Sequence, residues 1–274
     1  MIVVDGGGGS AWPVVEQFQG MNIEYAEVDP PSLTKQKNAG TSLVNPTVSL
    51  IGFMDDDFML EEGSLEAMMS FWEGAPSRLG GASFNLTGFK YSNSFIKSIP
   101  KRIFGIDDRE YGRVLRSGFN TPIWSVPETQ SVRWLCGGAT IWRKEVLEQW
   151  QFDEWFTGSG LWEDVRFSYR AGRKYDLAIV APAKGSFLAP PISGQREFAL
   201  GKTQVVNWVY FVGNNPNLSL TMCFWACSGR AVANLAKGLA SLNSDYIFRG
   251  TGNLYGIASA LITTLNPLNK RPVS

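Results

Sequence analysis

The chain has 274 residues, of which 44% are hydrophobic and 18% are charged, so it can bury a sizeable core and is neither disordered nor collagen-like. Its 25 basic and 25 acidic residues cancel, which argues against a nucleic-acid-binding protein held by bulk charge. The chain contains no histidine, which excludes Ser-His-Asp and Cys-His nucleophilic catalysis and histidine-ligated zinc. Any catalysis is therefore expected to depend on carboxylates.

The cysteines and the apolar segments indicate where the protein works. The chain has three cysteines, Cys136, Cys223 and Cys227. A small, odd number of cysteines makes a disulfide framework unlikely and favours a reducing compartment. The chain starts without a basic leader, and its longest apolar stretches, residues 218–227 and 254–265, are too short to span a bilayer. We therefore expect a cytoplasmic protein whose contact with a membrane, if it has one, is peripheral and at the inner face.

Short apolar runs alternate with turns and helix-like segments, and this pattern is typical of a mostly parallel sheet covered by helices. The strands are predicted at residues 2–4, 23–26, 48–54, 80–85 and 177–181, with regular patterning also over 132–142. The helices are predicted at residues 12–18, 33–44, 64–72, 144–150 and 163–171. Residues 86–130 lose clear periodicity and are interpreted as an insert. The predicted fold class is α/β.

The last part of the chain differs in composition from the rest. Residues 201–274 contain six Lys or Arg and one acidic residue, Asp245, and aromatic residues gather from position 205 onward. Apolar and aromatic helix faces with basic edges suit an anionic membrane surface, while the alternative is that these helices pack on the core. We predict an α/β domain over 1–200 and a C-terminal helical extension over 201–274, with residues 205–265 as the segment for which membrane contact and packing on the core both stay open.

Three consecutive aspartates, Asp55, Asp56 and Asp57, directly follow the predicted strand at 48–54. The carboxyl end of a parallel strand is where open α/β sheets bind their ligands. Adjacent like charges repel, and a divalent cation with oxygen ligands, Mg²⁺ or Mn²⁺, stabilises such a group and brings phosphates with it. The alternative is a solvated acidic turn that caps the following helix.

A second acidic pair, Glu163-Asp164, follows a glycine-rich loop and begins a predicted helix. One explanation is a favourable interaction with the helix dipole, worth ~0.3 to 1 kcal/mol. The functional explanation is that one carboxylate faces a cleft and takes the proton from an attacking hydroxyl. Trp162, which precedes the pair, either stacks on a sugar ring or is buried.

Five short motifs, taken in order over roughly residues 1–185, resemble family 2 glycosyltransferases of the GT-A fold. They are Ile2-Val3-Val4-Asp5, Lys37-Asn38-Ala39-Gly40, Phe53-Met54-Asp55-Asp56-Asp57, Gly137-Gly138 leading to Trp142-Arg143, and Trp162-Glu163-Asp164 with Arg170. The resemblance implies an inverting, metal-dependent hexosyltransferase. Such an enzyme moves a sugar from a nucleotide-sugar donor to a saccharide or lipid-linked acceptor.

The resemblance also implies roles for individual residues. The catalytic positions are Asp164, as the general base, and Glu163 beside it; Trp162 falls on the acceptor side. Asp57 would hold Mg²⁺ or Mn²⁺. The donor side comprises Asp5 at the nucleotide base, Lys37 near the base or phosphates, Asp55 at the ribose, Asp56 and Gly138.

The sequence departs from the family pattern in three places. It opens without the usual first strand and helix, Gly6 replaces a second acid after Asp5, and no histidine occurs over residues 184–189. These departures keep open a catalytically inactive, transferase-like sugar- or nucleotide-binding protein or gene fragment. A further alternative is a phosphatase with an Asp-x-Asp motif, but that class prefers Thr or Val where this chain has Met59.

Overall fold

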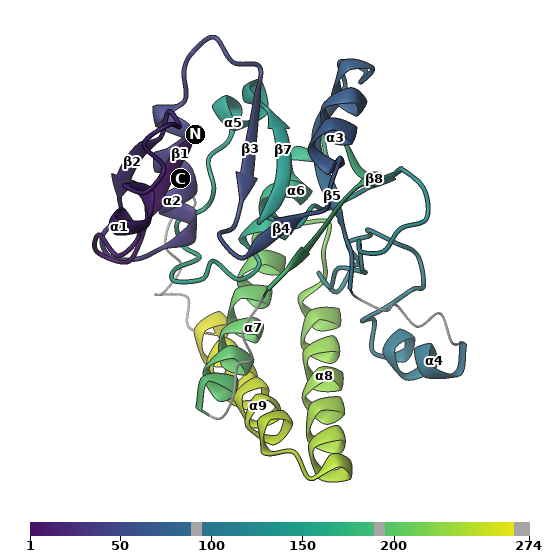
Figure 1. The fold of residues 1–274 in the computed structure, drawn as a ribbon. Helices are drawn as coiled ribbons and strands as arrows, with labels where there is room; N and C mark the ends of the chain where they lie inside the picture. The colour runs from purple at the N-terminus through teal and green to yellow at the C-terminus, as the bar shows by residue number, and fades with distance from the viewer. Residues whose placement is uncertain (89–94, 189–194, 266–274) are drawn as a thin grey trace. The chain divides into compact units, whose positions relative to one another are not determined.

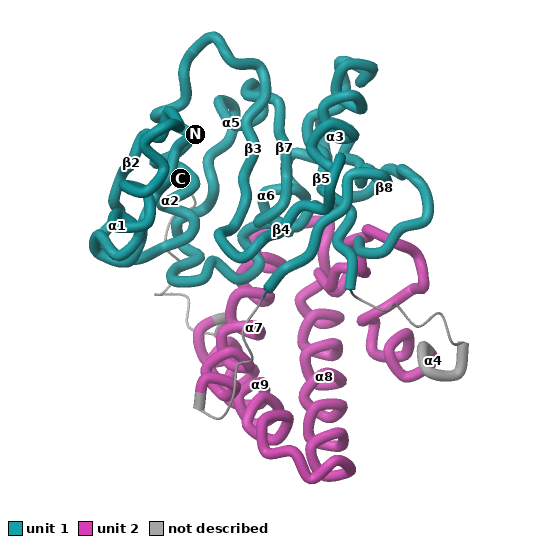
Figure 2. Tube along the Cα trace, in the orientation of Figure 1, with its two compact units in different colours: residues 1–91, 123–188 teal, residues 92–122, 189–274 magenta. Residues whose placement is uncertain are grey.

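The computed structural model describes residues 1–88, 95–188 and 195–265. The chain forms two compact units, coloured separately in Figure 2: residues 1–91 with 123–188, and residues 92–122 with 189–274. Part of the segment interpreted as an insert therefore belongs with the C-terminal helices. The domain division at residue 200 remains a prediction, because a compact unit and an independently folding domain are different properties.

The first unit contains the elements that carry the candidate site, and Figure 1 labels them. Its strands are β1 (Ile2–Asp5), β2 (Glu24–Glu27), β3 (Leu50–Met54), β4 (Phe58–Leu60), β5 (Leu79–Leu86), β6 (Gln130–Val132), β7 (Ala139–Arg143) and β8 (Asp176–Phe187). Its helices are α1 (Trp12–Val15), α2 (Leu33–Leu43), α3 (Ser64–Glu73), α5 (Lys144–Gln149) and α6 (Glu163–Ala171). Compared with the predicted elements, α1 is shorter, β8 is longer, and β4 was not foreseen.

The central sheet confirms the α/β class but is mixed rather than mostly parallel. Its strand order is β3-β7-β5-β8-β4, and β6 also pairs with β8. Only β5 and β8 pair in parallel there, whereas β7 is antiparallel to β3 and β5, and β4 and β6 are antiparallel to β8. Apolar runs report burial and not strand direction, which is why the sequence pattern suggested a parallel sheet.

The sheet is covered on both faces (Figure 1). Met68 and Trp72 of α3 pack on one face in a buried cluster with Phe84 and Ile141. The next residue, Trp142, points to the opposite face because side chains alternate along a strand, and its ring meets Phe167 of α6 with centroids 4.9 Å apart. This packing holds the ends of β3 and β7 and the start of α6 in fixed positions.

The strands β1 and β2 form a separate parallel pair. The helix α2 packs on this pair, and Gln36 Nε2 donates a hydrogen bond to the carbonyl oxygen of Val4 at 2.7 Å. The N-terminal end of α2 is held by the loop before α6, because Leu33 N donates to the carbonyl oxygen of Gly158 at 2.9 Å. This double attachment directs Lys37, near the middle of α2, toward the start of α6.

The second unit is helical, which confirms the predicted C-terminal helical region. Its helices are α4 (Phe95–Ile103), α7 (Gln195–Gly213), α8 (Leu220–Ser241) and α9 (Ser244–Leu265). A salt bridge between Arg249 and Glu197 joins α9 to α7, and Asn253 Nδ2 donates to the carbonyl oxygen of Gly201 at 2.9 Å. Within the described ranges, no helix combines the length and apolar character needed to cross a bilayer.

Candidate active site

Two adjacent glycines, Gly137 and Gly138, lie at the entrance to β7 and organise the acidic residues. The backbone N–H of Asp55 donates to the carbonyl oxygen of Gly138 at 3.0 Å, directly after β3 ends. The Asp55 carboxylate lies against the Gly138 Cα, so closely that even its farther oxygen, Oδ1, is only 2.9 Å from where a Cβ would be. Only glycine allows this close approach.

The neighbouring glycine holds the second acidic cluster. Gly137 N donates to Asp164 Oδ2 at 3.1 Å, and Val165 N donates to Asp164 Oδ1 at 2.7 Å. Asp164 is half-buried in the first turn of α6. The two acidic clusters, which are far apart in the sequence, therefore meet on consecutive residues of one loop.

The charges of these groups act on one another. Burial raises the pKa of Asp55, the charges of Asp57 and Asp164 raise it further, and Lys37 opposes them. Burial also raises the pKa of Asp164, against the lowering effect of Lys37 and of the hydrogen bond from Gly137. A carboxylate with a raised pKa is a better proton acceptor, so the shift suits Asp164 to general-base chemistry.

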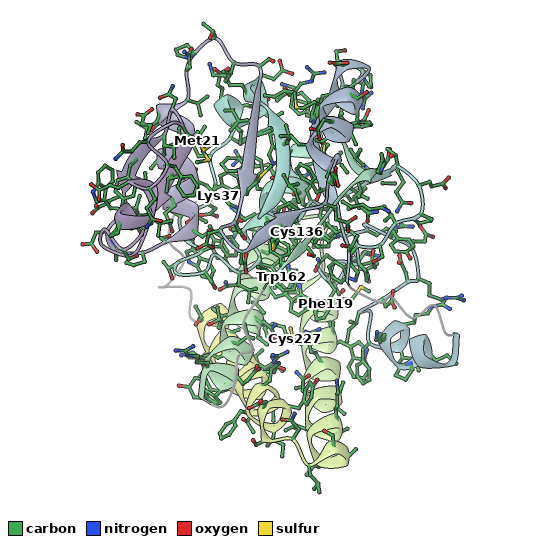
Figure 3. The ribbon with its side chains drawn as sticks, in the orientation of Figure 1. Met21, Lys37, Phe119, Cys136, Trp162 and Cys227 are labelled. Carbon is green, nitrogen blue, oxygen red and sulfur yellow. The ribbon has the colours of Figure 1, made fainter. Side chains whose placement is uncertain are left out.

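Lys37 and Glu163 form an ion pair inside the protein. The ammonium Nζ of Lys37 is 2.5 Å from Glu163 Oε1, and the two side chains are only 5% and 3% exposed. Lys37 Nζ also donates to the carbonyl oxygen of Gly137 at 3.0 Å. Figure 3 labels Lys37, whose ammonium therefore lies among protein acceptors rather than at a surface ready for a donor. Its expected donor contact remains a prediction.

Glu163 is a buried acid with one unsatisfied oxygen. Burial raises its pKa to about 7, the charge of Asp164 adds to the increase, and Lys37 acts in the opposite direction. Within the described part of the chain, its second oxygen, Oε2, has no hydrogen-bond partner. Glu163 is therefore enclosed next to Asp164, a residue that is half-buried.

Asp5 organises its own loop. Its carboxylate accepts hydrogen bonds from Gly7 N at 2.5 Å, Ala11 N at 2.8 Å and the Tyr25 hydroxyl at 2.8 Å. The hydrogen bonds from Ala11 and Gly7, followed by that from Tyr25, lower the pKa of Asp5. A nucleotide base at Asp5 would have to share or displace these donors; the expected base contact remains a prediction.

The other predicted residues lie at the edge of this cluster. Asp56 is exposed and Asp57 half-buried in the turn between β3 and β4, where Asp57 O accepts from Leu188 N at 2.8 Å. Trp162 is the N-cap residue of α6 and has a φ of 79°, which is rare for a bulky residue. Its half-buried side chain is labelled in Figure 3, and its backbone conformation sets where Glu163 and the helix begin.

Sequence reasoning did not single out Cys136, which precedes the two glycines and is labelled in Figure 3. Burial and the charge of Asp164 raise the pKa of this thiol to about 12, so it stays protonated and is not a nucleophile at neutral pH. A cavity of about 10 Å³ lies nearby, with room for about one water. It is lined by Leu135, Gly137, Thr140, Trp142, Phe152, Asp164, Phe167 and Ser168.

The acidic turn fits a metal ion of a particular kind. Across residues 1–88, 95–188 and 195–265, no three His, Cys, Asp or Glu side chains converge as a protein-only metal cage. Mg²⁺, and ions like it, are commonly bound by one or two carboxylates and take their remaining ligands from phosphates and water. Asp55 and Asp57 lie in one turn and raise the local negative charge, so they suit an ion that arrives with a diphosphate.

Comparison with solved structures identifies the fold. GalNAc-T7, crystallised with UDP, GalNAc and Mn²⁺, has a TM-score of 0.56 and 12% identity over 97% of this chain and 52% of its own. The mannosyltransferase PcManGT from Pyrobaculum calidifontis, in complex with GDP-Man and Mn²⁺, has a TM-score of 0.53 and 14% identity over 96% and 77% of the two chains. The structure of S. aureus TarS 1–349 matches at 12% identity and a TM-score of 0.48, and the match covers 98% of this chain and 75% of the TarS chain.

Sequence comparison adds no closer relative. No protein-family model matches the chain, and no curated protein is similar enough in sequence to match. The fold assignment depends on the structural similarity to GalNAc-T7 and PcManGT. Because the sequence identities are low, this similarity establishes the fold and not the activity. The chain therefore has a GT-A-like glycosyltransferase fold.

Proposed function

We propose that this protein is an inverting, metal-dependent glycosyltransferase of the family 2 type. It moves a hexosyl group from a nucleotide-sugar donor to a saccharide or lipid-linked acceptor. The observation that carries the proposal is the convergence of Asp55 and Asp164 on the consecutive glycines 137 and 138. The GT-A-like fold supports it, because solved neighbours with this fold were crystallised with nucleotide ligands.

In this mechanism Asp164 accepts the proton of the acceptor hydroxyl. The hydroxyl oxygen forms a bond to the anomeric carbon, the bond from that carbon to the phosphate oxygen breaks, and the nucleoside diphosphate leaves from the opposite side. Attack from that side inverts the anomeric configuration. Asp57, with Asp55 beside it, would hold Mg²⁺ or Mn²⁺, which when bound offsets charge on the leaving diphosphate. The hydrogen bond from Gly137 N keeps the Asp164 carboxylate oriented.

The test is an Asp164→Asn variant assayed with a panel of UDP- and GDP-sugars and Mn²⁺. We expect transfer to fall by about 10² to 10⁴-fold while donor binding persists, because only the proton acceptor is lost. Glu66→Gln is the matched control, since Glu66 is an exposed acid in the first turn of α3. If Asp164 serves only the helix dipole, both variants will lose a little stability and neither will lose transfer.

The same assay separates the alternatives. In the wild-type protein, donor binding without turnover would favour a non-catalytic, transferase-like binding protein and would contradict the proposal. Phosphate covalently attached to Asp55 after incubation with a phosphoryl donor would favour the Asp-x-Asp phosphatase. Asp57→Ala should weaken donor binding in the presence of Mn²⁺ and leave metal-free binding unchanged, because Asp57 is assigned to the metal.

We also propose that the turn joining α8 and α9 contacts an anionic membrane surface, where a lipid-linked acceptor would lie. Leu239 and Leu242 are 68% and 93% exposed at this turn, and Lys237 lies close to them in the chain. Apolar side chains beside a cation suit the interface of anionic lipids. The double variant Leu239→Ser/Leu242→Ser should no longer float with anionic vesicles, whereas Val232→Ser, at a position 57% exposed within α8, should float normally. Equal flotation of both variants would contradict this contact.

A further inference from the structure

The surroundings of Lys37 point to a role other than donor binding. Its ammonium is enclosed by Glu163 Oε1 and the carbonyl oxygen of Gly137, and it also faces the rings of Phe53 and Phe152 at 5.7 and 5.1 Å from their centroids. A buried ammonium is stable only when its charge is compensated by close partners. These partners are all protein groups, so they account for the burial of Lys37 without any ligand.

The backbone of Gly137 connects this pair to the candidate base through the two peptide groups that flank its Cα. Its carbonyl oxygen accepts from Lys37 Nζ at 3.0 Å, and its N–H donates to Asp164 Oδ2 at 3.1 Å. A Cβ at position 137 would lie 2.6 Å from both Glu163 Oε1 and Lys37 Nζ. Gly137 is therefore held at the carbonyl of one peptide group and at the N–H of the preceding one, so both of its backbone dihedrals are restrained and its N–H stays directed at Asp164.

We propose that Lys37 and Glu163 are positioning residues that hold the backbone of Gly137, and through it the Asp164 carboxylate, in the orientation that accepts a proton. Lys37 does not bind donor phosphates in this assignment. The inference rests on the proposed function only for the role of Asp164 as the base. The ion pair, its hydrogen bond from Lys37 to the Gly137 carbonyl oxygen, and the hydrogen bond from Gly137 N to Asp164 stand on geometry alone.

The electrostatics support this assignment. Burial lowers the pKa of Lys37, but the charges of Glu163, Asp164 and Asp55 outweigh burial and raise it, so the cation is retained. Without that cation, Glu163 would be a buried carboxylate with neither oxygen paired. Loss of Lys37 therefore disturbs the start of α6, where Asp164 is located.

The experiment compares Lys37→Met with Lys35→Met. Lys35 is on the same helix but two residues away, so its side chain points to a different face of the helix. With saturating donor and Mn²⁺, we expect Lys37→Met to lower kcat by about 10²-fold through displacement of the base, and to change the donor Kd by less than about threefold. Lys35→Met should match the wild type in both quantities. A Lys37→Met variant with an unchanged kcat and a donor Kd raised about tenfold or more would overturn the assignment, because that pattern identifies a donor ligand.

A double variant keeps the test informative if Lys37→Met does not fold. Lys37→Met/Glu163→Gln removes the ammonium and the buried carboxylate together, so no uncompensated charge remains. We expect its Tm to lie above that of either single variant, with kcat still reduced. A Tm below both single variants would contradict the pairing. Lys37→Arg should have a higher kcat than Lys37→Met, because it restores a cation. If the two variants have the same kcat, a charge-based positioning role is contradicted.

A readout independent of activity separates this inference from the proposed function. Hydrogen exchange of the Gly137 amide, followed by NMR in the protein without ligands, reports directly on its bond to Asp164. We expect this amide to exchange about tenfold or more faster in Lys37→Met/Glu163→Gln than in Lys35→Met. Equal exchange would overturn the positioning role even if transfer is observed. If the wild type transfers no sugar but the Gly137 amide exchanges faster in the double variant, the proposed function is refuted. The positioning contact between Gly137 and Asp164 is then still supported.

Discussion

Replacing Gly138 by alanine tests whether the position of Asp55 matters for the reaction. A new Cβ at this position would meet the whole Asp55 carboxylate, whose farther oxygen would be only 2.9 Å away and whose nearer oxygen would be closer still. Real Cβ contacts are not this short, so the carboxylate has to move. The required displacement is about 1 Å, and a misplacement of that size in a catalytic site costs about 10²-fold in rate.

The same substitution has a modest expected effect on stability. Overpacking a filled site costs about 1 to 3 kcal/mol, and alanine recovers about 0.5 to 1 kcal/mol because it restricts the unfolded chain more than glycine does. The net loss of unfolding free energy expected for Gly138→Ala is therefore about 0 to 2.5 kcal/mol. The protein should remain folded at 25 °C, so that a loss of transfer reports on the geometry of the site and not on unfolding.

The assay measures initial rates of transfer at saturating donor together with Tm. Gly52→Ala in β3 is the matched control, because its new Cβ would find its nearest neighbours, Ile141 Cγ1 and Thr140 O, at an ordinary 3.7 Å. We expect Gly52→Ala to retain wild-type rates and Gly138→Ala to lose about 10²-fold. A folded Gly138→Ala protein with wild-type turnover would refute the reasoning, since it would mean that Asp55 can be displaced without consequence.

Three further predictions address other parts of the chain. Asp5→Asn should speed hydrogen exchange at the amides of the loop that Asp5 holds through Gly7 N and Ala11 N. Because the pKa of Asp5 is lowered in the folded protein, the stabilisation of this loop by the carboxylate is present above pH ~4 and is lost as the pH falls through the folded-state pKa. Gly252→Ala should destabilise the protein in denaturant unfolding, because its Cβ would collide with the carbonyl oxygen of Phe198 on α7, and the clash outweighs the roughly 1 kcal/mol that alanine gains in a helix. The pKa of Glu163 is raised from 4.5 to about 7, so this carboxyl group holds its proton more tightly in the folded protein than in the unfolded chain. As the pH rises from about 4.5 to 7, the free energy of unfolding of the wild type should therefore fall by on the order of 3 kcal/mol relative to that of Glu163→Gln.

Each of these predictions has a contrary result. Unchanged exchange in the loop after Asp5→Asn would show that the carboxylate is not what holds it. Gly252→Ala should be compared with Gly213→Ala, whose new Cβ would find only Leu220 at 3.9 Å, and equal stability of the two would contradict the close contact of α7 and α9. Parallel stability curves for the wild type and Glu163→Gln across that pH range would contradict the raised pKa of Glu163.

The elements of the fold were predictable where an apolar run ends at a polar residue. Strand β3 ends at Met54, directly before Asp55, and helix α6 begins at Glu163; both boundaries can be read from the sequence because acidic residues follow an apolar run in one case and a glycine-rich loop in the other. Strand direction was not predictable, since β7 inserts between β3 and β5 through a long connection. The grouping of residues 92–122 with the C-terminal helices was also missed, because local periodicity contains no information about distant packing.

The candidate site was predictable in its acids and not in its supports. The resemblance to a known family pointed to Asp55 and Asp164, because charged residues beside apolar runs stand out in a sequence. The pairing of Lys37 with Glu163 joins two helices that are distant in the chain, and it depends on the carbonyl oxygen of Gly137, which any residue type would provide. A backbone acceptor leaves no mark in the amino-acid sequence.

A site built from carboxylates needs positive charge and hydrogen-bond donors to stay together, because like charges repel. Here Lys37 provides one full charge, and the N–H groups of Gly137 and Val165 provide partial charges directed at Asp164. These groups compensate the acids at the start of α6 more fully than those of the β3–β4 turn, where Asp56 and Asp57 add negative charge to that of Asp55. The uncompensated charge is thus concentrated at the turn to which the proposed function assigns the metal, whereas the internal cation pairs with Glu163, beside the proposed base. This division of charge is consistent with one loop that holds a proton acceptor at Gly137 and a metal-binding carboxylate at Gly138, as the proposed function requires.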